Sequence, residues 1–167
     1  MRRLLALVLC MVLLTLCLSS CEKDPPIGAP YAREIKVTDG TVSVVPYEHF
    51  AFGQRRVQSG GWATVDGLFL DSILKDGSEA LKNIPTLTKT ENVSVELGEN
   101  GELRHFDVYD LEYNLIEPSR KTIEDVNALS TGEWYIAVCV TWQGNYVPSA
   151  EKHETETYVH IFKLIVE

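Results

Sequence analysis

Cysteine is scarce in this sequence, and most of it lies at one end. The 167 residues include four cysteines; Cys10, Cys17 and Cys21 fall within the first 21 residues, and only Cys139 lies further on. The part of the chain after residue 21 therefore has no pair of cysteines for an internal disulfide. A chain of this length buries enough apolar surface to fold without such a cross-link, so we expect one domain held together by its core.

Basic residues are also few. The chain carries 15 Lys and Arg against 24 Asp and Glu, which gives a formal net charge of −9. Proteins bind nucleic acid largely by neutralising its phosphates with Lys and Arg. An acidic surface instead repels phosphates and anionic lipid head groups. We therefore expect no nucleic-acid partner.

The short motifs of common catalytic sites are missing. His153-Glu154 begins a zinc-protease pattern, but the position of the second histidine is Thr157. The stretch 110–114 lacks the Gly and Glu that complete a calcium-binding loop. Cys139 lies between two valines in a predicted strand, where burial makes a thiol unreactive. We expect no enzyme activity, no metal and no cofactor. We expect the four histidines, His160 among them, at the surface or at sheet edges. A zinc site built from these scattered histidines and a small extracytoplasmic hydrolase or metal-dependent enzyme are the alternatives.

No apolar run is long enough to cross a membrane. The longest extends from Leu4 to Leu18 and is broken only by Thr15, whereas a membrane-spanning helix needs roughly 20 apolar residues. The run follows Arg2 and Arg3. A short basic start, an apolar segment of this length and small residues after it are typical of a secretory signal peptide.

The end of this segment carries a specific resemblance. Leu18-Ser19-Ser20-Cys21 resembles the lipobox of bacterial lipoproteins, in which an aliphatic residue and two small residues precede an obligatory cysteine. The resemblance implies that residues 1–20 are a signal peptide and that Cys21 carries a lipid thioether. It also implies a chain anchored to the extracytoplasmic face of the bacterial cell membrane or envelope. Lipoproteins of this type carry at least two acyl chains, and two chains give stable attachment where one gives only marginal attachment.

Residues 21–30 predict a tether between lipid and domain. Three prolines and one glycine lie in the nine residues from Glu22 to Pro30. Proline-rich segments favour an extended polyproline geometry of about 3.1 Å per residue, which gives a reach of roughly 28 Å. The alternative is that part of this segment packs on the domain.

Residues 31–167 predict a mainly β domain. Asp39-Gly40 lies between two alternating runs and predicts a tight hairpin turn. The strongest strand signal places five large apolar residues on one face: Trp134, Ile136, Val138, Val140 and Trp142. A last strand from Tyr158 to Val166 would pair with it. Spacing predicts two short helical segments, one between Phe69 and Leu81 and one from Thr122 to Leu129. In the second, Thr122 and Asp125 have the spacing of a capping box at the start of a helix.

The closing hairpin resembles the last two strands of an immunoglobulin-like domain. A turn at Gly132 leads into an aromatic-rich strand that ends at Trp142, and a loop then leads to a final strand with Tyr and Phe. The resemblance implies an immunoglobulin-like antiparallel β-sandwich with one or two short helices. Such folds host many functions, so the likeness does not identify an activity.

The region between these two strands supplies a candidate contact surface. We expect a long loop from Gln143 to Thr155, with candidate partner-contact residues Tyr146, Lys152, His153 and Glu154. The alternative is a tolerated insertion with no role in binding. The sequence thus favours a membrane-anchored, non-catalytic module that binds a protein or glycan partner. A structural or assembly factor of the envelope is a further alternative.

Overall fold

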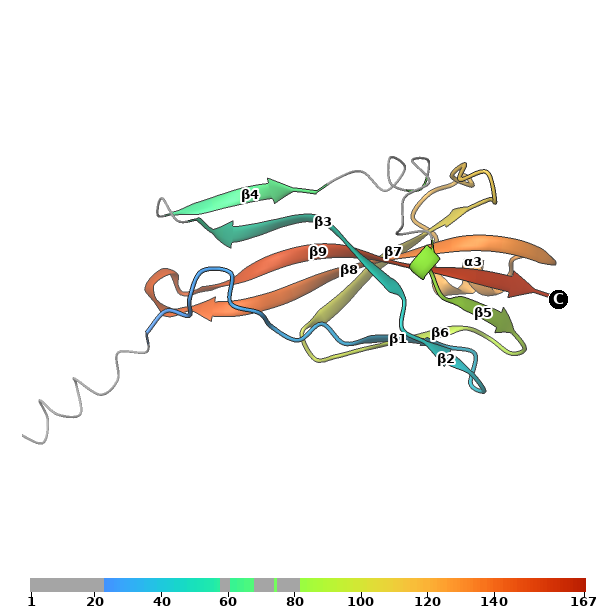
Figure 1. Cartoon of the computed structure of the whole chain (residues 1–167), viewed down its shortest axis with the longest axis horizontal. Helices are drawn as coiled ribbons and strands as arrows, with labels where there is room; N and C mark the ends of the chain where they lie inside the picture. Colours follow the sequence, from blue (N-terminus) through green and yellow to red (C-terminus); the bar gives the residue numbers. More distant parts are fainter. Residues whose placement is uncertain (1–22, 58–60, 68–73, 75–81) are drawn as a thin grey trace, which may run out of the picture.

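We describe a computed structural model of the chain over residues 23–57, 61–67, 74 and 82–167 (Figure 1). Cys21 and the signal segment lie outside these residues. The helix expected between Phe69 and Leu81 also lies outside them, except for Leu74, which is helical and buried.

Two sheets make up the domain. The three-stranded sheet has the order β2-β1-β6 and the six-stranded sheet the order β4-β3-β9-β8-β7, with β5 paired to β9. The strands are β1 (Ile35–Thr38), β2 (Ser43–Val44), β3 (Tyr47–Arg56), β4 (Trp62–Asp66), β5 (Thr86–Lys89), β6 (Ser94–Leu97), β7 (Gly101–Tyr109), β8 (Gly132–Val147) and β9 (Lys152–Val166). All pairs are antiparallel except β5–β9. The expected mainly β sandwich is confirmed.

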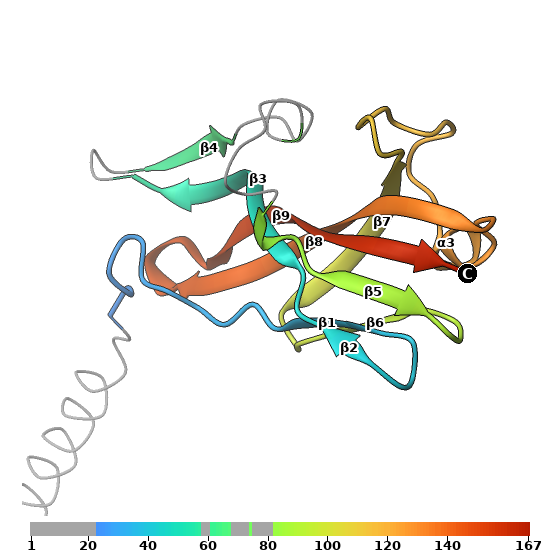
Figure 2. The ribbon, with the colours of Figure 1, turned by 45° about the vertical axis from the view of Figure 1, so that its right-hand side comes forward.

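The β8–β9 hairpin forms the centre of the six-stranded sheet. It confirms the strand that was predicted most strongly from the sequence, the one with apolar residues alternating from Trp134 to Trp142. Four of the five alternating apolar residues of β8 have no exposed surface: Ile136, Val138, Val140 and Trp142. They face the three-stranded sheet and pack with residues such as Val37 and Phe106 in one buried cluster. Figure 2 shows β1, β2 and β6 lying across this face of the hairpin. The core therefore lies between the two sheets.

The expected turn at Asp39-Gly40 joins β1 to β2. Gly40 has φ +89°, a conformation that favours glycine. The buried Asp39 carboxylate accepts hydrogen bonds from the backbone N–H groups of Thr41 and Val42 at 3.0 and 2.8 Å. Its other oxygen accepts from the N–H and hydroxyl of Thr90 at 3.1 and 2.7 Å. These bonds hold the pKa of Asp39 well below its usual value, and they tie this turn to the end of β5.

The second expected helix is also present. The helix α3 (Ile123–Asn127) begins after Thr122, whose hydroxyl accepts from the N–H of Asp125 at 3.3 Å. The Asp125 carboxylate in turn accepts from the N–H of Thr122 at 2.8 Å. This reciprocal capping arrangement was predicted from the spacing of the two residues.

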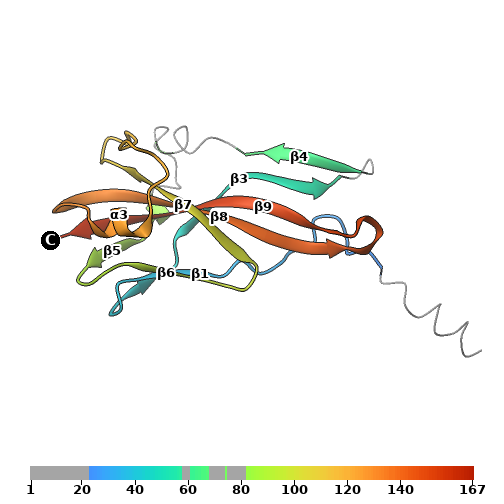
Figure 3. The same ribbon diagram turned by 180° about the vertical axis from the view of Figure 1, so that it is seen from behind.

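The prediction of a long loop from Gln143 to Thr155 is wrong. β8 continues to Val147, a single 3₁₀ turn η2 (Pro148–Ala150) follows, and β9 begins at Lys152. The ladder is irregular between Gln143 and Tyr146, and this bulge breaks the alternation that marks a strand in the sequence. The turn lies at the same end of the molecule as the first described residues, while the C-terminus and α3 lie at the other end (Figures 1 and 3).

Candidate functional site

The described residues cover the outer face of the six-stranded sheet, away from the core, over only part of its length. Alternation along β8 places Ala137, Cys139 and Thr141 on this face. A second apolar cluster covers the region around Ala137, with Leu74 and Tyr109 as its other buried members. Further along β8, toward the hairpin turn, the side chains on this face become polar.

This part of the face forms a hollow of about 550 Å³, which we call the outer hollow. β8 and β9 supply its floor, β3 and β4 one wall, and β7 with the loop after it the other. Its lining residues are Phe52, Gly53, Gln54, Thr64, Arg104, His105, Arg120, Cys139, Thr141, Thr155 and Thr157.

Hydrogen-bonding side chains form a row across the outer hollow. Thr141 and Thr157 are cross-strand partners, and their hydroxyls lie 3.0 Å apart. Gln54 on β3 pairs with Thr155 on one side and Thr64 on the other. Threonine is common on half-exposed sheet faces. Here four threonine hydroxyls and one amide are gathered on a concave surface, where a single ligand can reach several of them.

Two β-bulges shape the walls of the outer hollow. The β3–β9 register shifts between Phe50 and Phe52, and Phe52 then pairs with Thr157 on the outer face, with 51% of its surface exposed. The β7–β8 register shifts between Leu103 and His105. Bulges redirect side chains and are frequent beside functional sites.

The β7 wall is basic. Arg104, at the bulge, donates from Nε to the Thr141 hydroxyl at 3.0 Å and from Nη1 to Glu102 at 2.8 Å. His105 lies 3.4 Å from the carboxylate of Asp107. Arg120 adds a guanidinium that forms no hydrogen bond or ion pair with any residue that the structure describes. The described lining thus includes two arginines and one histidine and no carboxylate, although Glu102 and Asp107 lie directly beside Arg104 and His105.

Cys139 lies on the floor of the outer hollow beside this wall. Burial, together with the charge of Asp107, raises the pKa of its thiol to about 11. The thiol is therefore almost fully protonated at neutral pH. His105 is its cross-strand partner on β7, but no hydrogen bond joins the two side chains among the described contacts.

The four residues predicted to contact a partner lie at or next to the hairpin turn, but one of them, Glu154, is buried and cannot contact a partner. Tyr146 is 44% exposed, and its ring centroid lies 5.0 Å from that of His153. The Lys152 ammonium lies 3.6 Å from the centroid of the Trp62 ring. Glu154 is buried, and its carboxylate accepts from the backbone N–H of Arg56 at 3.1 Å. Glu154 thus acts inside the domain rather than at its surface.

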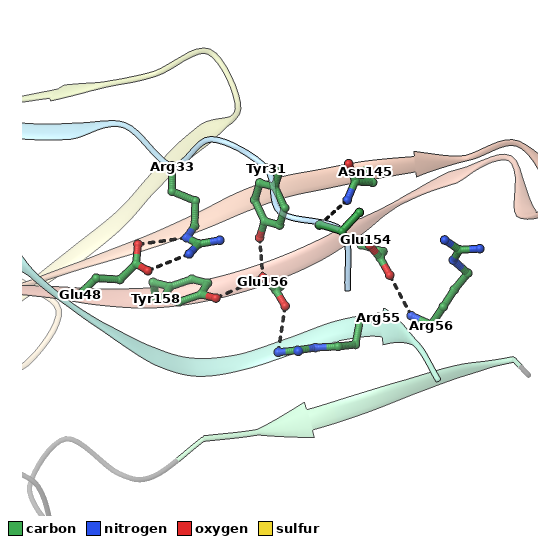
Figure 4. A network of polar contacts seen from close by, with 10 residues as sticks. Tyr31, Arg33, Glu48, Arg55, Arg56, Asn145, Glu154, Glu156 and Tyr158 are labelled. Atoms are coloured by element: carbon green, nitrogen blue, oxygen red, sulfur yellow. Dashed lines mark hydrogen bonds and ion pairs between the residues drawn. The ribbon is translucent and has the colours of Figure 1, made fainter. Parts of the chain in front are cut away.

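The proline-rich segment lies against the same end of the domain. The Asp24 carboxylate accepts from the N–H and the hydroxyl of Ser149 at 3.0 and 2.6 Å and lies 3.3 Å from the Arg56 guanidinium. Arg56 also donates to the carbonyl of Pro25. Asn145 donates to the carbonyl of Ala29 at 2.7 Å (Figure 4). We call these contacts the N-terminal clasp. Of the two arrangements left open by the sequence, packing on the domain is the one observed.

The clasp continues into a network around Glu156 (Figure 4). This buried carboxylate accepts from the hydroxyls of Tyr31 at 2.6 Å and Tyr158 at 3.3 Å and lies 2.9 Å from the Arg55 guanidinium. Burial and the bond to Glu156 raise the pKa of Tyr31 above its usual value. A Cβ at position 144 would lie 2.9 Å from the Tyr31 ring, so a larger residue there would displace Tyr31 from this position. The network fixes the start of the domain on β9.

The histidines do not converge. His160 was expected at the surface or at a sheet edge, and that expectation is wrong: it is fully buried, and its Nε2 accepts from the Trp142 indole N–H at 3.2 Å. His153 is at the hairpin turn and His105 in the outer hollow. Within the described ranges no group of three or more His, Cys, Asp or Glu side chains is arranged to hold a metal ion.

In the part of the chain that the structure describes, no helix has the length and apolar character needed to cross a membrane. A scan against protein-family models and searches of curated proteins and of solved structures found no match to this chain.

Proposed function

We propose that this chain is a lipid-anchored, non-catalytic binding module of the bacterial envelope and that its outer hollow binds an acidic saccharide. Attachment would be through Cys21, as the resemblance of Leu18–Cys21 to a lipobox implies. The observation that carries the choice of ligand is the combination of basic and hydroxyl-bearing side chains on one concave face of an acidic protein.

Each part of the lining suits one part of such a ligand. A guanidinium binds a carboxylate through two parallel hydrogen bonds, and Arg120 has this capacity unused among the described contacts. The threonine hydroxyls and the Gln54 amide can donate to and accept from sugar hydroxyls. The exposed Phe52 ring offers a rigid apolar surface to one face of a sugar ring.

A hydrolase is the second candidate, because Cys139, His105 and Asp107 lie close together on adjacent strands. A cysteine nucleophile needs a lowered pKa and a base within hydrogen-bonding reach. The raised pKa of Cys139 and the absence of a described hydrogen bond to His105 both disfavour this role. Binding without covalent chemistry suits the arrangement better.

The ligand class can be tested by calorimetry on the full chain in detergent micelles. The probe is oligogalacturonate, and its methyl-esterified form is the matched neutral control. Hydrogen bonds to charged groups contribute about 1.5–3 kcal/mol, so Arg120→Gln should weaken binding roughly ten- to hundredfold. Lys36→Gln is the control variant, because Lys36 is an exposed cation on the other sheet. Equal binding of the acidic and the esterified probe would contradict the proposal.

The anchor can be tested separately. Cys21→Ala should block both acylation and processing, so cells grown with a clickable palmitate analogue should label the native chain but not the variant. Equal labelling of the two would contradict a lipid on Cys21.

A further inference from the structure

The hairpin turn and the N-terminal clasp together place one end of the domain next to the residue that is proposed to carry the lipid. We call this end the hairpin end; it comprises residues 23–29, Trp62 and the turn from Tyr146 to His153. Asp24 is bonded to Ser149 and Arg56 within it. A chain extends by at most about 3.6 Å per residue, so Cys21 lies no more than roughly 11 Å from Asp24.

Because the proline-rich segment is bonded to the domain, it does not act as a free tether between the lipid and the domain. A free tether of nine residues would let the domain move through a radius of roughly 28 Å. With the segment bonded to Ser149, Arg56 and Asn145, only the residues before Asp24 remain between lipid and domain. The clasp therefore limits both the height and the tilt of an anchored domain.

The surface chemistry of the hairpin end suits a membrane interface. Ile27 and Tyr146 are large apolar or aromatic residues that are 47% and 44% exposed. Trp62 carries the Lys152 ammonium over its ring at 3.6 Å. Trp and Tyr are enriched where apolar lipid meets water, and Lys side chains extend their charge to the head groups at the same level.

Resting on the proposed attachment through Cys21, we propose that the hairpin end lies on the lipid surface and that the clasp holds the domain there in one orientation. The hairpin residues that we first expected to contact a partner, Tyr146, Lys152 and His153, then contact lipid. Thr141 lies six residues before Val147, so the outer hollow opens roughly 20 Å from the membrane along β8 at about 3.3 Å per residue. The outer hollow would therefore bind its ligand at a fixed height above the lipid surface.

Site-specific quenching tests this orientation in the lipidated full chain. A fluorophore is placed on Tyr146→Cys or, as the matched control, on Leu111→Cys, each in a Cys139→Ser background. Leu111 is 50% exposed and follows Tyr109, the partner of Tyr135, so it lies about 40 Å from the hairpin turn along β8. The chain is reconstituted into phosphatidylcholine vesicles that contain a lipid-bound nitroxide quencher.

We expect quenching by the lipid-bound nitroxide at position 146 and only the solution background at position 111. Asp24→Ala removes the bonds to Ser149 and Arg56 and should abolish the difference between the two positions. Glu99→Ala, a change at an exposed acid outside the clasp, should preserve it. Chains that float with the vesicles but show equal quenching at both positions would overturn the orientation alone. Chains that do not float with the vesicles would overturn the lipid anchor, and the orientation with it.

Discussion

His160 gives the most quantitative prediction, because a neutral imidazole is built into the core between the sheets. Its Nε2 accepts the Trp142 indole N–H, and its Nδ1 has no partner among the described residues. Protonation of Nε2 would break the bond to Trp142 and leave a buried charge. Burial accordingly lowers the pKa of His160 from 6.5 to about 4.

The consequence for stability follows from linkage. Between pH 6.5 and about 4 the unfolded chain binds a proton at this histidine and the folded chain does not, so the free energy of unfolding falls as the pH falls. A difference of about 2.5 pKa units, at 1.36 kcal/mol each, corresponds to about 3 kcal/mol. This contribution to the free energy of unfolding is fully present above pH 6.5. It decreases below that pH and is lost once the pH has fallen through about 4.

Urea unfolding at a series of pH values measures this contribution. Carboxylates such as Asp39 also destabilise the fold at low pH, so the informative quantity is the difference between the native chain and His160→Gln. Glutamine keeps an acceptor for the Trp142 indole but does not titrate. The native chain should lose about 3 kcal/mol more than the variant between pH 7 and 4. Parallel pH curves for the two proteins would refute the buried neutral imidazole.

Three further predictions concern the core, the clasp and the outer hollow. Trp142→Ala should lower the free energy of unfolding by about 3–5 kcal/mol, because the ring is fully buried, and Trp134→Ala should cost clearly less; equal losses in urea unfolding would contradict this. Gly144→Ala should push Tyr31 off β8 and make the segment before Tyr31 more sensitive to proteolysis, and an unchanged cleavage rate would count against the clasp. Cys139 should react with iodoacetamide far more slowly than a free thiol at pH 8, since its pKa is about 11. A rate equal to that of glutathione would favour the hydrolase alternative.

The regular parts of the fold follow from local sequence signals. Alternation along β8 predicted both the strand and its buried face, and the Asp39-Gly40 and Thr122–Asp125 signals predicted a turn and a helix cap. These features depend on residues close together in the chain. They are therefore visible in the sequence without knowledge of the tertiary structure.

The features that make the candidate site were not predictable in the same way. Bulges on β3, β7 and β8 break the two-residue period of a strand. The residues of the outer hollow therefore form no regular sequence pattern, and the end of the hairpin has the sequence character of a loop. His160 was misplaced because its burial depends on Trp142, a partner on the neighbouring strand. The clasp joins Asp24 to Ser149, which are 125 residues apart in the sequence. Local sequence patterns do not predict a contact between residues so far apart.

The central claim is that the outer hollow is the ligand site, and threonine methyl NMR tests it most directly. The lipidated chain in detergent micelles, labelled at its threonine methyl groups, is titrated with oligogalacturonate. We expect saturable shifts at Thr64, Thr141, Thr155 and Thr157, which line the hollow, and none at Thr88 and Thr131, which lie elsewhere on the surface. No saturable shift at the four lining threonines, or shifts of equal size at the two control threonines, would contradict the account.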